Sequence, residues 1–273
     1  MTPAPLPDGQ TATAKWGDLR TRILSAIVMI LVGAAEIWLG GIAFAALVIV
    51  LTALMMWELA TMTAPARRNT PVTLGVVAGA ALTAALVLRT EVAVLFLVVP
   101  TLMLALTPRR DRRLSSAYAL AIMLAGYGLV DLRDGAGTLA ILWLVAVVIA
   151  SDVLGYFAGR MLGGPKFWPA ISPKKTWSGT VAGWIGAALV GAAFWSAGHG
   201  GIWLIVLSPI VAFAGQMGDV AESWLKRRSG VKDASRLIPG HGGVLDRFDA
   251  FIGAVVAVMA LELFLPVAPA IGG

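Results

Sequence analysis

Long apolar stretches separated by short basic loops run along the whole chain, and they constrain its fold more than any other feature. Several stretches exceed the roughly 18 to 20 residues that a helix needs to cross the hydrocarbon core of a bilayer. Only 13% of the 273 residues are charged, against roughly 25% in an average soluble domain. The sequence therefore predicts an all-α, polytopic integral membrane protein.

The apolar pattern predicts about nine transmembrane helices within a single transmembrane domain, residues 21–273. We expect residues 21–135 to hold the N-terminal helices, and residues 136–273 to hold the helices and cytoplasmic loops with the candidate catalytic residues. Residues 1–20 are predicted to form a disordered cytoplasmic tail, because they are mostly polar and begin with several prolines. The predicted spans are 21–39, 41–60, 73–88, 92–106, 115–130, 138–162, 178–197, 202–225 and 248–268. The third and fourth spans are short, so a total of eight is the alternative.

The basic residues predict how these helices are oriented. With nine spans, all but two of the 21 lysines and arginines lie at one face, and only Arg89 and Arg133 lie at the other. Lysine and arginine are concentrated in the cytoplasmic loops of membrane proteins. We therefore expect the N-terminus and the basic loops at the cytoplasmic face, and the C-terminus at the opposite face.

Composition excludes several kinds of chemistry. The chain has no cysteine, so disulfides, thiolate metal sites and cysteine nucleophiles are ruled out. With only two histidines, a metal site built from several histidines is not expected. The net charge of +6 follows from the basic loops and gives no argument for nucleic acid binding. A basic cytoplasmic face instead suits anionic lipid headgroups.

Acidic residues inside apolar stretches indicate function, because inserting one into a membrane costs roughly 2.5–3.5 kcal/mol. Asp152 and Asp219 lie within predicted spans, close to polar loops at the same face. On a helix, Asp219, Glu222, Ser223 and Lys226 share one face, which leads into a basic loop. These acids are therefore candidate functional residues.

Three glutamates near span ends have a simpler interpretation. Glu36, Glu58 and Glu262 lie where an internal salt bridge or contact with the membrane interface explains a carboxylate. Two glycine pairs spaced four residues apart, one beginning at Gly155 and one at Gly179, predict close helix packing.

The loop between the sixth and seventh predicted spans, "GGPKFWPAISPKKTWSG", places positive charge before a helix start. Its prolines predict extended backbone. Ser172, Lys174, Lys175 and Thr176 come just before the seventh span, whose free amides and positive dipole end favour anions. The alternative is an ordinary basic loop, with Thr176 or Ser178 as the N-cap of the helix.

The segment before the ninth span, "KRRSGVKDASRLIPGHGGVLDRFD", repeats this arrangement with six basic residues and three aspartates. The glycines of "PGHGG" allow backbone amides to approach a ligand. Asp246 and Asp249 share a face of the next helical turn, either as partners of the helix dipole or as metal ligands. Carboxylates beside basic residues suit Mg²⁺ with a polyphosphate, because Mg²⁺ takes few carboxylates and fills its shell with water and phosphate oxygens. His241 is favoured as a hydrogen-bond donor to phosphate over a metal ligand.

Residues 223–249 resemble the signature of the phosphatidate cytidylyltransferase family, also called the CDP-diacylglycerol synthases. The matching positions are Ser223, Lys226, Arg227, Lys232, Asp233, Pro239, His241, Gly242, Gly243, Asp246, Arg247 and Asp249. The segments "SDVLGYFAGRMLGG" and "ISPKKTWSG" are similar to upstream blocks of the family, whereas the first half of the chain matches only in hydropathy. The family usually has a glutamate after "KKTW", where this chain has Ser178.

The resemblance implies an enzyme that transfers CMP from CTP to phosphatidic acid, releasing pyrophosphate and giving CDP-diacylglycerol for phospholipid biosynthesis. It implies a homodimer in the inner (plasma) membrane with its active site at the cytoplasmic face. It also implies Mg²⁺ as the metal, accompanied by K⁺.

The family's functional residues can be carried over position by position. The resemblance implies metal binding by Asp219 and Asp246, with Asp152 and Asp249 as weaker candidates, and catalytic roles that include Lys226 and His241. Substrate or phosphate binding is implied for Ser172, Lys174, Lys175, Thr176, Ser223, Arg227, Lys232, Asp233, Gly242, Gly243 and Arg247.

Two other classes remain as alternatives. A CTP-dependent polyprenol or phytol kinase would also be polytopic with basic loops, but it should lack the Lys-Asp, His-Gly-Gly and Asp-Arg run. An ion-coupled transporter would explain the acids within spans, but not two phosphate-suited loops at one face. Since the chain has no cysteine, and its polar loops offer no serine paired with a histidine base apart from the isolated His241, we expect direct attack by the lipid phosphate on CTP, without a covalent enzyme intermediate.

Overall fold

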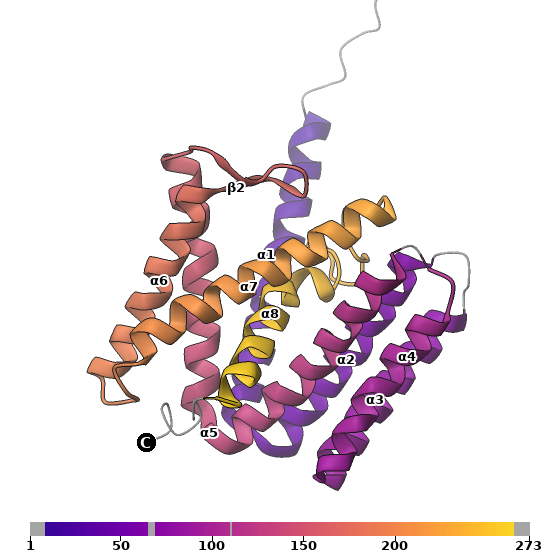
Figure 1. The fold of residues 1–273 in the computed structure, drawn as a ribbon. Coiled ribbons are helices and arrows are strands. Elements are labelled where there is room, and N and C mark those ends of the chain that lie inside the picture. The colour runs from indigo at the N-terminus through magenta and orange to yellow at the C-terminus, as the bar shows by residue number, and fades with distance from the viewer. Residues whose placement is uncertain (1–8, 65–68, 110, 265–273) are drawn as a thin grey trace, which may run out of the picture.

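The computed structural model describes residues 9–64, 69–109 and 111–264, and helices dominate them (Figure 1). In chain order the elements are α1 (Gly9–Leu39), α2 (Gly41–Thr63), α3 (Asn69–Leu88), the 3₁₀ helix η1 (Glu91–Leu97), α4 (Val98–Leu106), α5 (Arg112–Met161), β1 (Lys166–Trp168), β2 (Ser172–Thr176), α6 (Trp177–Ser196), α7 (Leu204–Ser229) and α8 (Leu245–Glu262). The strands pair antiparallel in a short hairpin, in a segment for which only extended backbone was predicted. Helix α1 begins inside the predicted tail, whose first eight residues lie outside the described ones. The structure is otherwise that of an all-α membrane protein, as predicted.

Six of the described helices are long and apolar enough to cross a membrane: α1, α2, α3, α5, α6 and α7. The predicted number of nine spans is therefore not confirmed. The fourth predicted span is a shorter apolar stretch, Val92–Leu106, in which η1 continues into α4. Helix α8 has 18 residues; its first turns carry Asp246, Arg247 and Asp249, and it ends at Glu262.

Helix α5 accounts for two predicted spans, 115–130 and 138–162. Its 50 residues form two helices that meet at a kink at Gly137, where φ is 76° and ψ is −168°. Glycine reaches positive φ at little steric cost, so the chain reverses direction here, as Figure 1 shows at the lower end of the molecule. The segment predicted as a loop between the two spans is helical almost to the kink.

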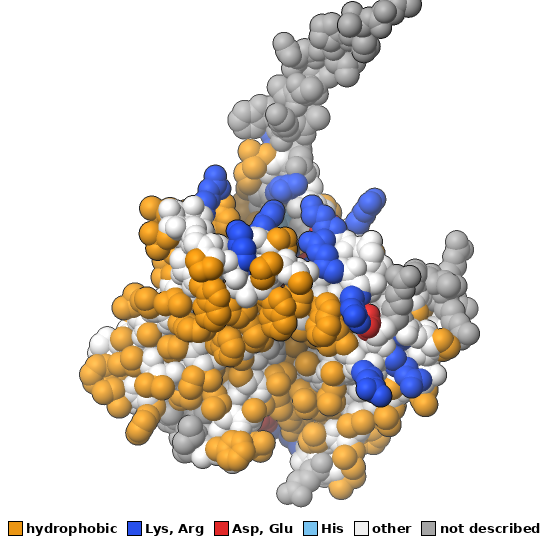
Figure 2. Space-filling view, turned by 45° about the horizontal axis from the view of Figure 1, so that its top comes forward, with side chains coloured by type: hydrophobic (Ala, Val, Ile, Leu, Met, Phe, Trp, Pro, Cys, Tyr) orange, Lys and Arg blue, Asp and Glu red, His pale blue; other side chains and the backbone are white. Residues whose placement is uncertain are grey.

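The two ends of the helical bundle differ in charge. In Figure 1 the hairpin and the C-terminal end of α7 lie at the upper end, whereas the α5 kink and the C-terminal end of α8 lie at the lower end. Lysine and arginine side chains gather toward the upper end in Figure 2, above a broad hydrophobic surface. At the lower end, Arg89 pairs with Asp134 at 2.6 Å. This separation agrees with the predicted grouping of the basic loops.

Glycines allow α5, α6 and α7 to pack closely. A methyl group placed on Gly179 of α6 would lie 2.5 Å from the carbonyl oxygen of Gly155 in α5. Gly183, one turn further along α6, lies against Ser151 of α5 and the side-chain amide of Gln216 in α7. The predicted glycine pairs therefore do pack helices together, and they bring the second half of α5 against α6 and α7.

Candidate active site

A cavity of ≈ 570 Å³ lies among the second half of α5, strand β2, α6, α7 and the start of α8. Carboxylates from three helices line it: Asp152 from α5, Asp219 from α7, and Asp246 and Asp249 from α8. Four acidic residues from three separate stretches of the sequence therefore line one cavity. All four were predicted as metal-binding candidates.

Basic side chains line the same cavity. They come from the end of α5 and from strand β2, and they are Arg160, Lys174 and Lys175. Lys175 Nζ lies 2.5 Å from Asp219 Oδ2 and donates to the carbonyl oxygen of Gln216 at 3.3 Å. The cavity can therefore bind anionic groups beside its carboxylates. Arg160 was predicted only as a charge that sets membrane orientation.

One face of α7 carries the polar side chains that were predicted to share it. Ser223 Oγ donates to Asp219 Oδ1 at 3.2 Å, and Lys226 forms an ion pair with Glu222, one turn before it. The side chain of Glu222 is 0% exposed. A buried carboxylate of this kind is strongly destabilising without a partner, so Lys226 is its structural counterion. Lys226 also donates to Asp246 Oδ1 at 2.8 Å.

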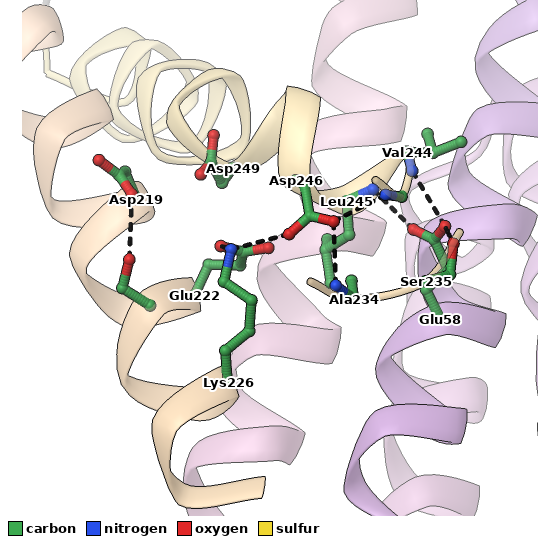
Figure 3. Close-up of polar contacts among 12 residues, drawn as sticks. Glu58, Asp219, Glu222, Lys226, Ala234, Ser235, Val244, Leu245, Asp246 and Asp249 are labelled. Carbon is green, nitrogen blue, oxygen red and sulfur yellow. Dashed lines mark hydrogen bonds and ion pairs between the residues drawn. The ribbon is translucent and has the colours of Figure 1, made fainter. Parts of the chain in front are cut away.

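Asp219, Glu222 and Asp249 bring carboxylate oxygens within 4.8 Å of one another. Figure 3 shows these three side chains between α7 and α8. Negative groups this close repel one another unless cations or protons lie among them. Oxygen-only ligands suit hard divalent cations, so the donor set fits a metal ion. Glu222 was missed as a ligand, although its spacing of three residues from Asp219 was the available signal.

Asp246 makes a different set of contacts. Its Oδ2 accepts hydrogen bonds from the backbone amides of Ala234 at 2.9 Å and Gly243 at 2.7 Å, while Oδ1 accepts from Lys226. Asp246 thereby ties the segment before α8 to α7, as the dashed lines of Figure 3 show. Its role as a metal ligand stays a prediction.

Comparison with known proteins identifies the family. Residues 20–265 match the model of the cytidylyltransferase family. The chain belongs to this family. The phosphatidate cytidylyltransferase of Brucella abortus biovar 1 (strain 9-941) is 37% identical over 257 residues, covering 90% of this chain and 93% of that protein.

Two further relatives carry the same name. The phosphatidate cytidylyltransferase of Helicobacter pylori (strain ATCC 700392 / 26695) is 41% identical over 134 residues, which cover 48% of this chain and 50% of that protein. The one from Staphylococcus haemolyticus (strain JCSC1435) is 44% identical over 115 residues, which cover 41% of this chain and 44% of that protein. The resemblance drawn from the sequence motifs is confirmed.

The remaining predicted residues do not line the cavity. They are Ser172, Ser223, Lys226, Arg227, Lys232, Asp233, His241, Gly242, Gly243 and Arg247. Four of them, Arg227, Lys232, Asp233 and Arg247, are exposed. Gly242 has a φ of 84°, and a methyl group placed on it would lie 2.8 Å from Asp246 Oδ2. The glycines of this segment therefore allow the backbone to approach a protein carboxylate.

His241 is held by the first helix. Its Nδ1 lies 2.8 Å from Ser25 Oγ of α1, and the same hydroxyl donates to the carbonyl oxygen of Pro239 at 3.0 Å. The predicted role of His241 as a donor to phosphate would use its other ring nitrogen. Ser25 was not singled out by the sequence, since a serine in an apolar helix gives no local signal.

At the start of α6, the two candidate caps have different roles. Thr176 is the N-cap, and its hydroxyl accepts from the amide of Gly179 at 3.2 Å. Ser178 Oγ instead donates to the carbonyl oxygen of Gly163 at 2.5 Å. The alternative with Ser178 as N-cap is therefore wrong. Thr176, two residues earlier, already caps the helix with its hydroxyl group.

Glu58 also departs from its interpretation as an interfacial or salt-bridged residue. It is 0% exposed on α2, and its carboxylate accepts hydrogen bonds from the segment before α8 and from the first residue of α8. Its contacts are to residues that are far away in sequence, which is why the sequence around it gave no indication of this role.

Proposed function

We propose that this chain transfers CMP from CTP to phosphatidic acid, giving CDP-diacylglycerol and pyrophosphate. The observation that carries the proposal is the cavity in which carboxylates of α5, α7 and α8 face the lysines of the hairpin. The reaction must bring two polyanions together, so positioning and charge neutralisation dominate its catalysis. The relatives named phosphatidate cytidylyltransferase support the same reaction.

The residues of the cavity fit the needs of this transfer. Lys174, Lys175 and Arg160 would bind the phosphates of CTP. The lipid phosphate is already an anion, so no base is required to activate it. One of its oxygens forms a bond to the α-phosphorus of CTP, the bond from that phosphorus to the α,β-bridging oxygen breaks, and pyrophosphate leaves with the electron pair.

We propose Mg²⁺ as the metal, held by Asp219, Glu222 and Asp249, whose oxygens lie close enough together to share one ion. When bound, it would offset negative charge on the nucleotide phosphates. An accompanying K⁺ and a homodimer are proposed on the family resemblance alone.

Product analysis tests the reaction class. Purified protein in lipid nanodiscs is incubated with Mg²⁺, phosphatidic acid and CTP labelled in the cytidine. We expect CDP-diacylglycerol and pyrophosphate in equal amounts, with intersecting lines in steady-state kinetics. CDP with a newly phosphorylated lipid would identify a kinase instead, and flux of solute across liposomes without any nucleotide turnover would identify a transporter. Exchange of labelled pyrophosphate into CTP without lipid would contradict direct transfer.

We propose further that nine helical segments cross the inner membrane, with α5 contributing two, and that the cavity opens at the cytoplasmic face. The positive-inside tendency supports this orientation. The absence of cysteine makes a direct test simple. Gly135 near the kink is exposed, and Ser116 near the start of α5 is half-buried with its hydroxyl hydrogen bond at the surface, so Ser116→Cys and Gly135→Cys should be labelled by an impermeant maleimide from opposite sides. Labelling of both from one side would refute this topology.

A further inference from the structure

We infer that Glu58 of α2 is a positioning residue for the active site, which holds the start of α8 and the preceding loop, residues 230–244, in the geometry needed for turnover. The inference rests on the proposed function. It gives the N-terminal helices a defined part in the chemistry of the C-terminal ones.

The carboxylate of Glu58 accepts three hydrogen bonds from this segment. Its Oε1 accepts from Ser235 Oγ at 2.5 Å and from the backbone amide of Val244 at 2.9 Å. Its Oε2 accepts from the backbone amide of Leu245 at 2.6 Å. Figure 3 shows Glu58 reaching from α2 toward the beginning of α8. Hydrogen bonds to an ionised acceptor are stronger than neutral ones, so this is a firm attachment.

Helix α8 does not cap itself. Its N-cap residue is Val244, which makes no capping hydrogen bond with its side chain. The first amides of a helix have no partners within the helix, and a negative group near them is favoured by the helix dipole. Glu58, which lies on a different helix, supplies a hydrogen-bond acceptor for these amides and a negative charge near them. It therefore fixes where α8 begins.

Because Gly243 has no side chain, the carboxylate of Glu58 can approach the backbone at this position. A methyl group placed on Gly243 would lie 2.6 Å from Glu58 Oε1, which is closer than any real side-chain carbon would approach. This glycine is part of the family-like motif, where its predicted purpose was to let amides approach a ligand. In this structure, the group that closes on it is a carboxylate of the protein itself.

The hydrogen bonds of Glu58 connect to the acidic cluster formed by Asp219, Glu222 and Asp249. The amide of Gly243, beside the Glu58 contacts, donates to Asp246, and Asp246 accepts from Lys226, the counterion of Glu222. Asp249 follows Asp246 by one helical turn. A shift of the first turn of α8 would therefore move Asp249 relative to Asp219 and Glu222.

Activity of the intact protein gives the first test. Glu58→Gln keeps the shape of the side chain, but its amide nitrogen cannot accept a hydrogen bond and its charge is lost. Thr52→Val is the matched control, because Thr52 is also fully buried on α2 and its hydroxyl has no partner among the described residues. We expect kcat to fall at least about tenfold in Glu58→Gln, the scale of one lost hydrogen bond to a charged group, and to change less than about twofold in Thr52→Val.

The labelling rate of a single reporter cysteine, measured without substrate or metal, distinguishes a loss of positioning from a general loss of structure. Ala234 in the loop is buried and donates to Asp246, whereas Thr63 is buried at the end of α2 and contacts Leu59 and Arg109. Single cysteines, Ala234→Cys and Thr63→Cys, are placed in the otherwise cysteine-free chain. We expect Glu58→Gln to accelerate maleimide labelling of the Ala234 reporter at least about tenfold, the same hydrogen-bond scale, and to leave the Thr63 reporter unchanged.

Each outcome decides the inference. Unchanged labelling at Ala234 would overturn it, and equal acceleration at both reporters would show that Glu58 serves overall stability instead. Normal kcat in Glu58→Gln would also overturn it. If the parent protein made no CDP-diacylglycerol, the proposed function would fail, while the labelling rates would still show whether Glu58 holds the loop.

Discussion

The β1–β2 hairpin and the loop of residues 230–244 look alike in sequence but use their polar groups differently. Both are basic, both contain turn-forming residues, and both precede a helix. The hairpin directs Lys174 and Lys175 into the cavity, where Lys175 meets Asp219. The loop turns toward the protein: its histidine contacts Ser25, and the amide of Val244 at its end donates to Glu58.

This difference shows why a helix N-terminus in a sequence is not yet an anion site. Two of the amides that begin α6, those of Gly179 and Trp177, donate to the Thr176 hydroxyl and to the carbonyl oxygen of Pro165. Those around the start of α8 donate to Glu58 and Asp246. With these amides satisfied by the protein, we expect substrate phosphates to bind to lysine side chains, and chiefly to those of the hairpin.

The largest expected effect is on the acid that faces the hairpin. Asp219→Asn keeps the shape of the side chain but removes one charge from the acidic cluster. We expect turnover to fall at least about 100-fold, the scale of a lost electrostatic contribution in an active site, and higher Mg²⁺ to restore part of it. Asp134→Asn, which removes an aspartate from an ion pair at the opposite end, is the control and should stay near normal. Near-normal turnover in Asp219→Asn would show that the acidic cluster is not part of the active site.

A smaller effect separates the hairpin from the loop directly. Lys175→Met removes a cation that lines the cavity, whereas Lys232→Met removes one that is exposed and outside it. We expect kcat/KM for CTP to fall roughly tenfold or more in Lys175→Met, since hydrogen bonds to charged groups are worth about 1.5–3 kcal/mol, and by less than about threefold in Lys232→Met. The reverse order of these two effects would make the loop the principal phosphate site.

Features set by local sequence were predictable, and they include most of the fold. The length of the apolar stretches located the helices, and the basic residues indicated which helix ends lie at the same face. The spacing of Asp219, Glu222 and Lys226 placed them on one face. The prediction missed the path of α5 because a helix can run through polar residues as far as Gly137, where positive φ lets it turn.

Contacts between distant segments were not predictable from one sequence. Glu58 lies 186 residues from Val244, and Ser25 lies 216 residues from His241. In both cases the chemistry of one residue depends on which helix packs beside it. The acidic cluster was partly predicted, because Asp219 is an acid within an apolar stretch and Asp249 belongs to the family-like motif, while Glu222 was left out and Asp246 has its oxygens occupied by the loop and Lys226.

Ser178 offers the smallest and most discriminating test of the hairpin side. A serine that caps a helix could be replaced by an acid, since both accept from free amides. Ser178, however, donates to the carbonyl oxygen of Gly163, and a carboxylate cannot do so. We therefore expect Ser178→Ala to cost about 1 kcal/mol of unfolding free energy and Ser178→Glu somewhat more, because its charge would face a carbonyl oxygen.

Turnover should barely change in either variant, since Ser178 does not line the cavity. Thermal unfolding in detergent measures the stability loss, with Ser196→Ala as the control: Ser196 lies at the end of the same helix, and its exposed hydroxyl donates to the carbonyl oxygen of Ala193. A tenfold gain of turnover in Ser178→Glu would contradict this account. It would mean that an acid beside the hairpin takes part in the reaction, and that the hairpin contributes more to the chemistry than its lysines.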